Sequence, residues 1–167
     1  MSCVVYIMRH GIAEDTSPSG EDADRRLTPE GRRKVVEVAR GLKGMDIHPE
    51  IILSSALPRA METATLTAGV LDETLEVESF PSLGPGHDAE TTLGALSACR
   101  GAAGILLVGH QPHLGEIASY LLTGSATQAP FAFKKGGVAV FAVDSLPPKS
   151  VAELLWFMTP KQLRSLI

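Results

Sequence analysis

The apolar run at residues 4–8 ends directly at Arg9, His10 and Gly11, and this placement constrains the fold more than any other feature of the chain. A run of this length that contains β-branched residues and stops at a turn glycine is typical of a buried strand. Arg9 and His10 would therefore stand at the carboxyl end of the first strand, where open α/β sheets bind their ligands. An arginine beside a histidine at that edge can hold an oxyanion and attack it.

Apolar runs and helical patterns alternate along the rest of the chain. Further strands are predicted at residues 51–53, 75–80 and 105–108, followed by a hairpin of residues 138–143 and 151–158. Helices are predicted at about residues 28–44, 58–70, 88–99 and 112–122, with a short helix from residue 159. This alternation predicts one α/β domain over residues 1–167, with helices on both faces of a mostly parallel sheet and at least one antiparallel strand.

Length, composition and charge exclude several classes of protein. The chain has 167 residues, of which 44% are hydrophobic, so a globular domain with a sizeable core is expected. The formal net charge of −4 argues against a nucleic-acid binder that relies on bulk positive charge. No apolar run is long enough for a membrane span, and no signal peptide is recognisable, so no membrane partner is expected. Two distant cysteines, Cys3 and Cys99, are typical of a cytoplasmic protein with reduced thiols.

Two other predicted strands also end in residues that can bind an anion. Arg59 follows the strand at residues 51–53 at the start of a helix, and His110 follows the strand at residues 105–108 just before another helix. The carboxyl ends of parallel strands meet at one edge, so these residues should meet Arg9 and His10 there. Guanidinium groups fit phosphate oxygens in pairs, and helix N-termini add oriented N–H groups. A phosphoryl group is the predicted occupant of this site.

Each residue of this set also has a simpler interpretation. Taken alone, His10 would be a structural histidine and Arg59 a solvated helix residue. His110 and His113 could suggest a metal pair, but neither a cysteine nor a cluster of acids accompanies them. The combined pattern therefore favours an anion site, and we expect neither a metal nor a cofactor.

Three motifs resemble those of the histidine phosphatase (phosphoglycerate mutase-like) superfamily. They are IMRHG at residues 7–11, the S-x4-RA-x2-TA stretch at residues 54–64 and VGHQP at residues 108–112. The RLT sequence at residues 26–28, a compact length and the absence of an inserted cap make the chain most similar to SixA-type phosphohistidine phosphatases. The resemblance implies a three-layer αβα sandwich around a six-stranded, mostly parallel mixed sheet with one antiparallel strand.

The resemblance also implies roles for individual residues. His10 would be the nucleophile that forms a phosphohistidine intermediate, and a backbone carbonyl on its other ring nitrogen would fix the tautomer. Arg9, Arg59 and His110 would bind the phosphoryl oxygens and stabilise the transition state, so that no metal is required. The predicted substrate-binding residues are Gly11, Arg26, Ser54, His87 and Asp88.

The general acid of the ester-cleaving relatives has no clear counterpart in this chain. Those enzymes carry a glutamate in the loop after the third strand, and here Ser82 stands near that place. The remaining candidates are His87, Asp88, Glu90 and Glu14, although Asp88 is equally typical of a helix N-cap. A site with a weak acid can still cleave phosphohistidine, because imidazole leaves far more readily than an unprotonated alkoxide.

Three functions stay open at this point. The preferred one is a phosphohistidine phosphatase that acts on a phosphotransfer protein in signal transduction. A second is a phosphatase of a small phosphorylated metabolite, which would need a usable acid in residues 87–90. A third is a phosphoprotein-binding module without turnover, which would not need a nucleophile. The sequence leaves the oligomeric state open.

Overall fold

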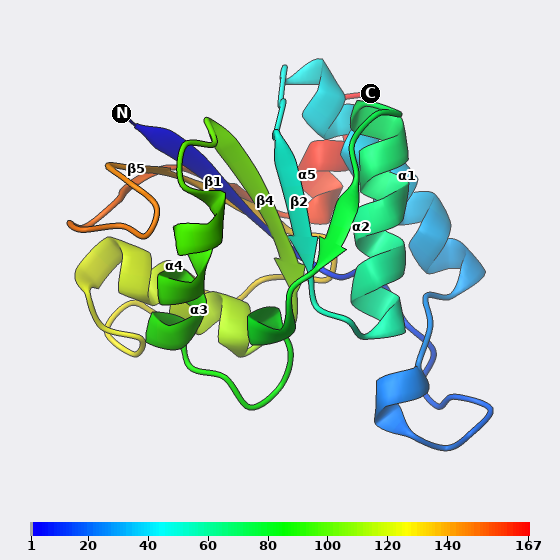
Figure 1. Ribbon diagram of the computed structural model, residues 1–167. Coiled ribbons are helices and arrows are strands. Elements are labelled where there is room, and N and C mark those ends of the chain that lie inside the picture. Colours follow the sequence, from blue (N-terminus) through cyan, green and yellow to red (C-terminus); the bar gives the residue numbers. More distant parts are fainter. Residues whose placement is uncertain (1) are drawn as a thin grey trace.

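Six strands form one mixed sheet in the computed structural model, which describes residues 2–167 (Figure 1). They are β1 (Cys3–Arg9), β2 (Ile51–Ser54), β3 (Val77–Ser79), β4 (Gly104–Gly109), β5 (Val138–Val143) and β6 (Glu153–Met158). Their order across the sheet is β3-β2-β4-β1-β5-β6. Strands β1 to β4 pair in parallel, whereas β5 is antiparallel to both β1 and β6. One strand of the six thus runs against the others, and the predicted mostly parallel mixed sheet is confirmed.

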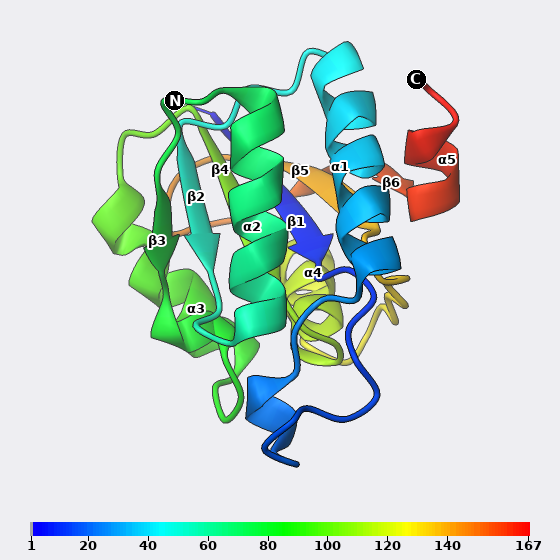
Figure 2. The same cartoon turned by 90° about the vertical axis from the view of Figure 1, so that its right-hand side faces the viewer.

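Five α-helices cover the two faces of this sheet within residues 2–167. They are α1 (Pro29–Gly44), α2 (Pro58–Leu71), α3 (Ala89–Ala95), α4 (His113–Thr123) and α5 (Pro160–Arg164). Figure 2 shows α1, α2 and α5 in front of the sheet and α3 and α4 behind it, which is the expected three-layer αβα arrangement. None of the helices described for residues 2–167 combines the length and the apolar character that a membrane crossing requires.

The side chains of β1 explain why its apolar run is continuous. Val5 and Ile7 pack into the core on the side of α3 and α4. Tyr6 and Met8 pack into the core on the side of α1 and α2. A strand that is covered on both faces needs apolar residues at consecutive positions, and the parallel pairing of β1 with β4 places it in the centre of the sheet.

Two threonine–proline pairs start helices as the sequence predicts. The Thr28 hydroxyl accepts a hydrogen bond from the Gly31 N–H at the start of α1, and Pro29 occupies the first helical position. Thr159 begins α5 in the same way, and its bond with Gln162 forms a complete capping box.

Some predicted elements are shorter in the structure. The predicted helix at residues 88–99 is α3 followed by a 3-10 turn, η3 (Leu96–Cys99), because the helix tightens in its last turn. The predicted strand at residues 75–80 is reduced to β3, which pairs only with residues 52–54 of β2. The predicted strand at residues 151–158 begins two residues late, because the Ala152 N–H donates to the Leu121 carbonyl of α4 instead.

The segments that follow β1, β2, β3 and β4 converge at the carboxyl ends of these parallel strands (Figure 2). The segment after β1 contains a 3-10 turn, η1 (Asp22–Asp24), and the segment after β3 contains another, η2 (Pro81–Leu83). The sheet therefore brings residues about fifty positions apart to one edge.

Leu107→Ala should destabilise the protein by about 2–5 kcal/mol, because the side chain is fully buried in β4 and its removal leaves a cavity. Leu166→Ala is the matched control, and its half-exposed side chain should change the free energy of unfolding by less than about 0.5 kcal/mol. Urea unfolding of both variants measures the difference. Equal effects of the two substitutions would contradict the assignment of the core.

Candidate active site

His10 lies directly after β1 with its imidazole almost fully buried. Its backbone N–H donates to the Gly109 carbonyl of β4, which fixes the main chain at this edge. The ring atom Nδ1 lies 2.7 Å from the Gly11 carbonyl. Since a carbonyl can only accept, Nδ1 carries the proton and Nε2 keeps its lone pair. The structure thus supplies the carbonyl that the sequence analysis expects, and the nitrogen that remains free is Nε2.

Gly11 has a structural role in holding His10. Its N–H donates to the Thr63 hydroxyl of α2 at 3.0 Å, while its carbonyl accepts the proton of His10. A Cβ atom at this position would lie 2.5 Å from Cγ2 of Val35 in α1, so only glycine allows the helix to approach so closely. Both polar groups of the Gly11 backbone are occupied within the protein. The predicted binding of substrate by Gly11 therefore has no free group to act through.

Arg9 is held by the segment that precedes β5. Its Nη1 donates to the Phe133 carbonyl at 2.7 Å. The Phe133 ring is buried and packs on Phe157 of β6, with ring centroids 4.9 Å apart, so the carbonyl is well anchored. Arg9 Nε is buried and has no hydrogen-bond partner in the protein. The side chain is thus fixed at one nitrogen and leaves another to bind an anion.

Arg59 lies in the first turn of α2 and is held from η1. Its Nη1 donates to the Asp22 carbonyl at 2.9 Å, and its Nη2 pairs with the Asp22 carboxylate at 3.2 Å. The guanidinium is mostly buried, and Nε has no partner in the protein. Arg59 is therefore anchored at both outer nitrogens, where Arg9 is anchored at one, and in both residues Nε has no partner.

His110 follows β4, and its ring centroid lies 5.1 Å from that of His10. Its Nε2 lies 2.8 Å from the Ser55 hydroxyl, which also accepts a hydrogen bond from the Leu57 N–H. Among the described residues, Nε2 is the one acceptor that contacts this hydroxyl, so we assign the hydroxyl proton to the bond with Nε2 and the proton of the His110 ring to Nδ1. Nδ1 is buried without a partner and can donate to an anion.

Burial makes both imidazoles neutral. Desolvation lowers the pKa of His10 to about 3, and the positive charges of Arg59 and Arg9 act in the same direction. Desolvation also lowers the pKa of His110 to about 4, followed by the effect of Arg59. The site therefore combines a neutral nitrogen with a free lone pair and three buried N–H groups that have no partner. Such a group of donors is suited to an anion.

Of the other predicted substrate-binding residues, only His87 lies beside this set. It lines a hollow of about 310 Å³ together with Arg59 and His110. The Ser54 hydroxyl is fully buried and donates to the Ser55 carbonyl, so its neighbour Ser55 is the serine that contacts the site. The sequence analysis missed this, because the two serines are adjacent and only the path of the chain after β2 distinguishes them.

Asp88 and Arg26 contact other parts of the protein. The Asp88 carboxylate caps α3 by accepting from the Thr91 N–H at 2.7 Å, and this bond lowers the pKa of the carboxyl group. Asp88 is thus an ionised N-cap, which is the simpler of its two interpretations. Arg26 is exposed and lines a different hollow beside Met61 of α2.

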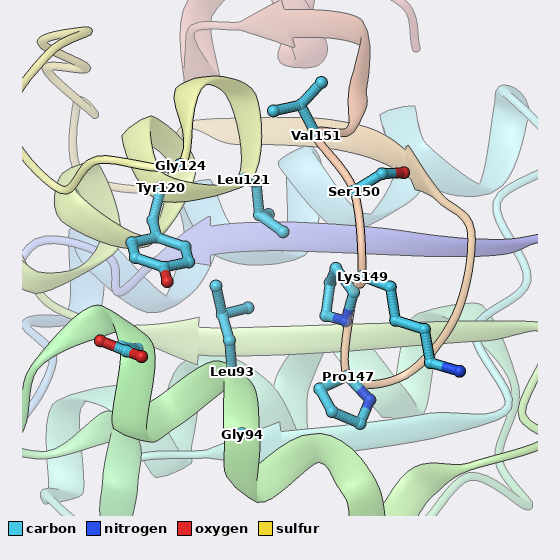
Figure 3. A pocket seen from close by; sticks show the side chains of 11 residues that line it. Leu93, Gly94, Tyr120, Leu121, Gly124, Pro147, Lys149, Ser150 and Val151 are labelled. Atoms are coloured by element: carbon cyan, nitrogen blue, oxygen red, sulfur yellow. The ribbon is translucent and has the colours of Figure 1, made fainter.

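The candidate general acids also differ in whether they lie beside the site. Glu90 lines a separate hollow of about 400 Å³ between α3, α4 and the connection from β5 to β6, where Leu93, Tyr120 and Leu121 point toward one another (Figure 3). The Glu14 carboxylate accepts from the Arg26 N–H. Glu116, which the sequence analysis did not consider, is the one carboxylate among the residues that line the hollow beside Arg59 and His110.

His113 has structural partners. Its Nε2 lies 3.0 Å from the Ser82 carbonyl and 2.9 Å from the Thr92 hydroxyl, so it joins α4 to η2 and α3. Within residues 2–167, no three side chains of His, Cys, Asp or Glu gather in a group that could hold a metal ion.

Comparison with known proteins identifies the family. Residues 5–84 match the model of the histidine phosphatase superfamily, branch 1. An uncharacterized protein of Picosynechococcus sp. is 36% identical over 140 residues, which cover 80% of this chain and 81% of that protein. The chain belongs to the histidine phosphatase superfamily. Members of this superfamily are phosphatases or mutases, which agrees with a site built for a phosphoryl group.

Two solved structures, each named for a phosphatase, superpose on nearly the whole chain. The protein histidine phosphatase SixA, in a complex with tungstate, is 28% identical with a TM-score of 0.84, and the match covers 96% of this chain and 99% of SixA. A putative alpha-ribazole-5'-P phosphatase from Escherichia coli is 18% identical with a TM-score of 0.77, covering 96% and 98% of the two chains. At 18% identity, the match to the alpha-ribazole-5'-P phosphatase is evidence for a shared fold only.

Acidification should destabilise this histidine phosphatase through His10 and His110. Below the ordinary histidine pKa of 6.5 the unfolded chain binds protons that the folded chain does not bind until about pH 3 to 4. The contribution of the two neutral histidines to the free energy of unfolding is therefore fully present above pH 6.5. Below that pH, the free energy of unfolding should fall by roughly 1.4 kcal/mol per histidine for each pH unit.

Urea unfolding at pH 7.5 and pH 5.0 measures this loss. In His10→Asn one of the two titrating groups is removed, while an amide remains to donate to the Gly11 carbonyl, so the loss between the two pH values should be smaller than in the wild type. An equal loss in both proteins would show that His10 is protonated in the folded state.

Proposed function

We propose that this protein is a phosphohistidine phosphatase that moves a phosphoryl group from a histidine of a protein substrate to His10 and then to water. One observation carries the proposal. His10 is buried and neutral with a free lone pair on Nε2, its ring lies 5.1 Å from that of His110, and the charges of Arg59 and Arg9 act on it. Each of these three neighbours has a buried nitrogen with no hydrogen-bond partner in the described part of the protein, namely Arg9 Nε, Arg59 Nε and His110 Nδ1. A phosphoryl group supplies both an electrophilic phosphorus for the nucleophile and oxygens for the donors.

The first step forms a bond between Nε2 of His10 and phosphorus. The bond from phosphorus to the substrate ring breaks and its electron pair stays on that ring, which is protonated at its other nitrogen and so leaves as neutral imidazole. Nδ1 of His10 keeps its proton and its bond to the Gly11 carbonyl, so the phosphorylated ring becomes cationic and remains oriented. Arg9, Arg59 and His110 donate to the phosphoryl oxygens, which is the main contribution that a phosphoryl-transfer site makes.

The second step returns His10 to its starting state. Water attacks phosphorus, the bond to Nε2 breaks, and Nε2 regains its lone pair as inorganic phosphate leaves. The two guanidinium groups supply positive charge throughout both steps. We therefore propose that the reaction proceeds without a metal ion.

Two features support phosphohistidine as the substrate. Imidazole is a good leaving group, so the reaction does not depend on a strong acid. Of the predicted acids, the carboxylates of Asp88 and Glu14 are engaged in hydrogen bonds and Glu90 lines a separate hollow, so that only His87 lies beside the site. The connections beside the site contain only short 3-10 turns, η1 and η2, which is compatible with access by a protein surface. The likeness to SixA supports the same substrate class. The free cysteines Cys3 and Cys99 agree with a cytoplasmic location, which we include in the proposal. A phosphotransfer protein as substrate would give the enzyme a role in signal transduction.

Glu116 favours a second candidate, a phosphatase of a small phosphorylated metabolite. Its partly exposed carboxylate lines the hollow beside Arg59 and His110 and could protonate an alkoxide leaving group there. The fold is shared with a putative alpha-ribazole-5'-P phosphatase, a protein named for a small-molecule substrate.

A substrate panel in the presence of a chelator separates the two candidates. We expect rapid release of phosphate from a histidine-phosphorylated protein, slow release from phosphate esters, and no effect of EDTA on either rate. Preference for an ester, with a loss of that activity in Glu116→Gln, would establish the second candidate. Tight binding of phosphate without turnover of any substrate would instead indicate a binding module.

His10→Ala should lower kcat by about a thousandfold or more, because it removes the nucleophile. Arg59→Lys should lower kcat/KM by about a hundredfold, because an ammonium group cannot reproduce the forked donors of the guanidinium. Steady-state kinetics with the histidine-phosphorylated protein measure both effects. Wild-type turnover by His10→Ala would refute the proposed mechanism.

A further inference from the structure

The carboxylate of Asp22 lies at the edge of the site, although the mechanism above gives it no role. It pairs with Nη2 of Arg59 at 3.2 Å, while the Asp22 carbonyl accepts from Nη1 of the same guanidinium. The third nitrogen of that group, Nε, is the one left free for the phosphoryl group. Asp22 and a bound phosphoryl group would therefore share Arg59 and lie on neighbouring sides of it.

Asp22 is ionised and open to a ligand. Its other oxygen pairs with Arg25 at 2.9 Å, and this hydrogen bond, together with the charge of Arg59, holds the pKa of the carboxyl group below its usual range. About 70% of the side chain is nevertheless exposed, so both oxygens keep lone pairs that can accept from an incoming group. The charge of Asp22 also acts on His110, where it opposes the lowering of the pKa.

An anion beside a phosphate site has opposite effects on different substrates. It repels a phosphate dianion and stabilises any positive charge on the leaving group. A phosphohistidine ring that is protonated at the nitrogen without phosphorus is cationic and presents an N–H group. On cleavage, this ring keeps that proton, takes the electron pair of the broken bond and leaves as neutral imidazole. An alkoxide leaving group offers neither the charge nor the N–H.

We propose that Asp22 is a specificity-determining residue whose carboxylate accepts the N–H of the substrate imidazole and so selects phosphohistidine over phosphate esters. The proposal rests on the proposed function and deepens it. Asp22 keeps the substrate ring protonated, so the ring departs without receiving a proton from the enzyme. Such a reaction needs no carboxylic acid as a proton donor, in keeping with the position of the predicted carboxylates Asp88, Glu14 and Glu90 away from Arg59 and His110.

Asp22→Asn tests the proposal, because it removes the charge while the backbone carbonyl still holds Arg59. The substrates are a histidine-phosphorylated peptide and p-nitrophenyl phosphate, and inhibition by inorganic phosphate is measured beside them. Asp24→Asn is the matched control. It removes the same charge from the same turn, where the carboxylate bonds to the Ser19 hydroxyl and not to Arg59.

Asp22→Asn should lower kcat/KM for the phosphohistidine peptide by about tenfold to a hundredfold, as expected for a lost charged hydrogen bond. The side-chain oxygen of the asparagine can still accept from Nη2 of Arg59 while a negative charge beside the phosphoryl site is lost, so hydrolysis of p-nitrophenyl phosphate and inhibition by phosphate should fall far less or rise. Asp24→Asn should leave the ratio of the two activities as in the wild type. This reversal of preference is an effect that a purely structural role would not produce.

Two other results would overturn the inference in distinguishable ways. Equal losses on both substrates, with weaker inhibition by phosphate, would show that Asp22 only orients Arg59 while the proposed function stands. A wild-type protein that hydrolyses esters but not phosphohistidine would refute the proposed function itself, and the selectivity of Asp22 with it.

Discussion

Burial of His10 keeps its imidazole neutral, and the 2.7 Å contact between Nδ1 and the Gly11 carbonyl decides which nitrogen is free to attack. Other features of the site support these two conditions. Gly11 can accept the proton because α1 approaches closely, and Thr63 of α2 holds its N–H. Arg9 and Arg59 could bind an anion without burial of the histidine, but a protonated His10 would have no lone pair for phosphorus.

The same environment has a cost for the folded protein. Three buried N–H groups have no partner within the chain, and each such group costs roughly 1–3 kcal/mol when it is left unsatisfied. An anion that accepts from all three would remove this cost on binding. The protein holds these donors in place through backbone carbonyls of Phe133 and Asp22 and through the Ser55 hydroxyl. Preorganisation of this kind suits a reaction in which charge is spread over phosphoryl oxygens.

Much of the fold and the centre of the site could be predicted from the sequence. The continuous apolar run of β1 indicates a strand that is covered by helices on both faces of the sheet. The alternation of strands and helices then indicates a parallel sheet whose ligands bind at the carboxyl ends of the strands. That edge brings His10, Arg59 and His110 together, although they are about fifty residues apart. The prediction concerned strand ends, which the sheet fixes, and it was accurate for that reason.

The residues around this centre could not be predicted in the same way. Asp22 reaches Arg59 across 37 positions of the sequence, and Phe133 reaches Arg9 across 124. Both contacts depend on the path of irregular segments, and a backbone carbonyl leaves no signature in the residue type that carries it. Ser54 and Ser55 differ only in which side of the chain they occupy at the end of β2, so a choice between them requires coordinates.

The most direct test of this account is to trap the phosphorylated enzyme. Rapid mixing with a histidine-phosphorylated peptide, an alkaline quench and mass spectrometry would locate the bound phosphoryl group, and phosphorus NMR would identify the ring nitrogen. We expect one phosphoryl group on Nε2 of His10, stable in alkali and labile in acid. A phosphoryl group on another residue, or turnover with no phosphorylated enzyme at any time point, would contradict it.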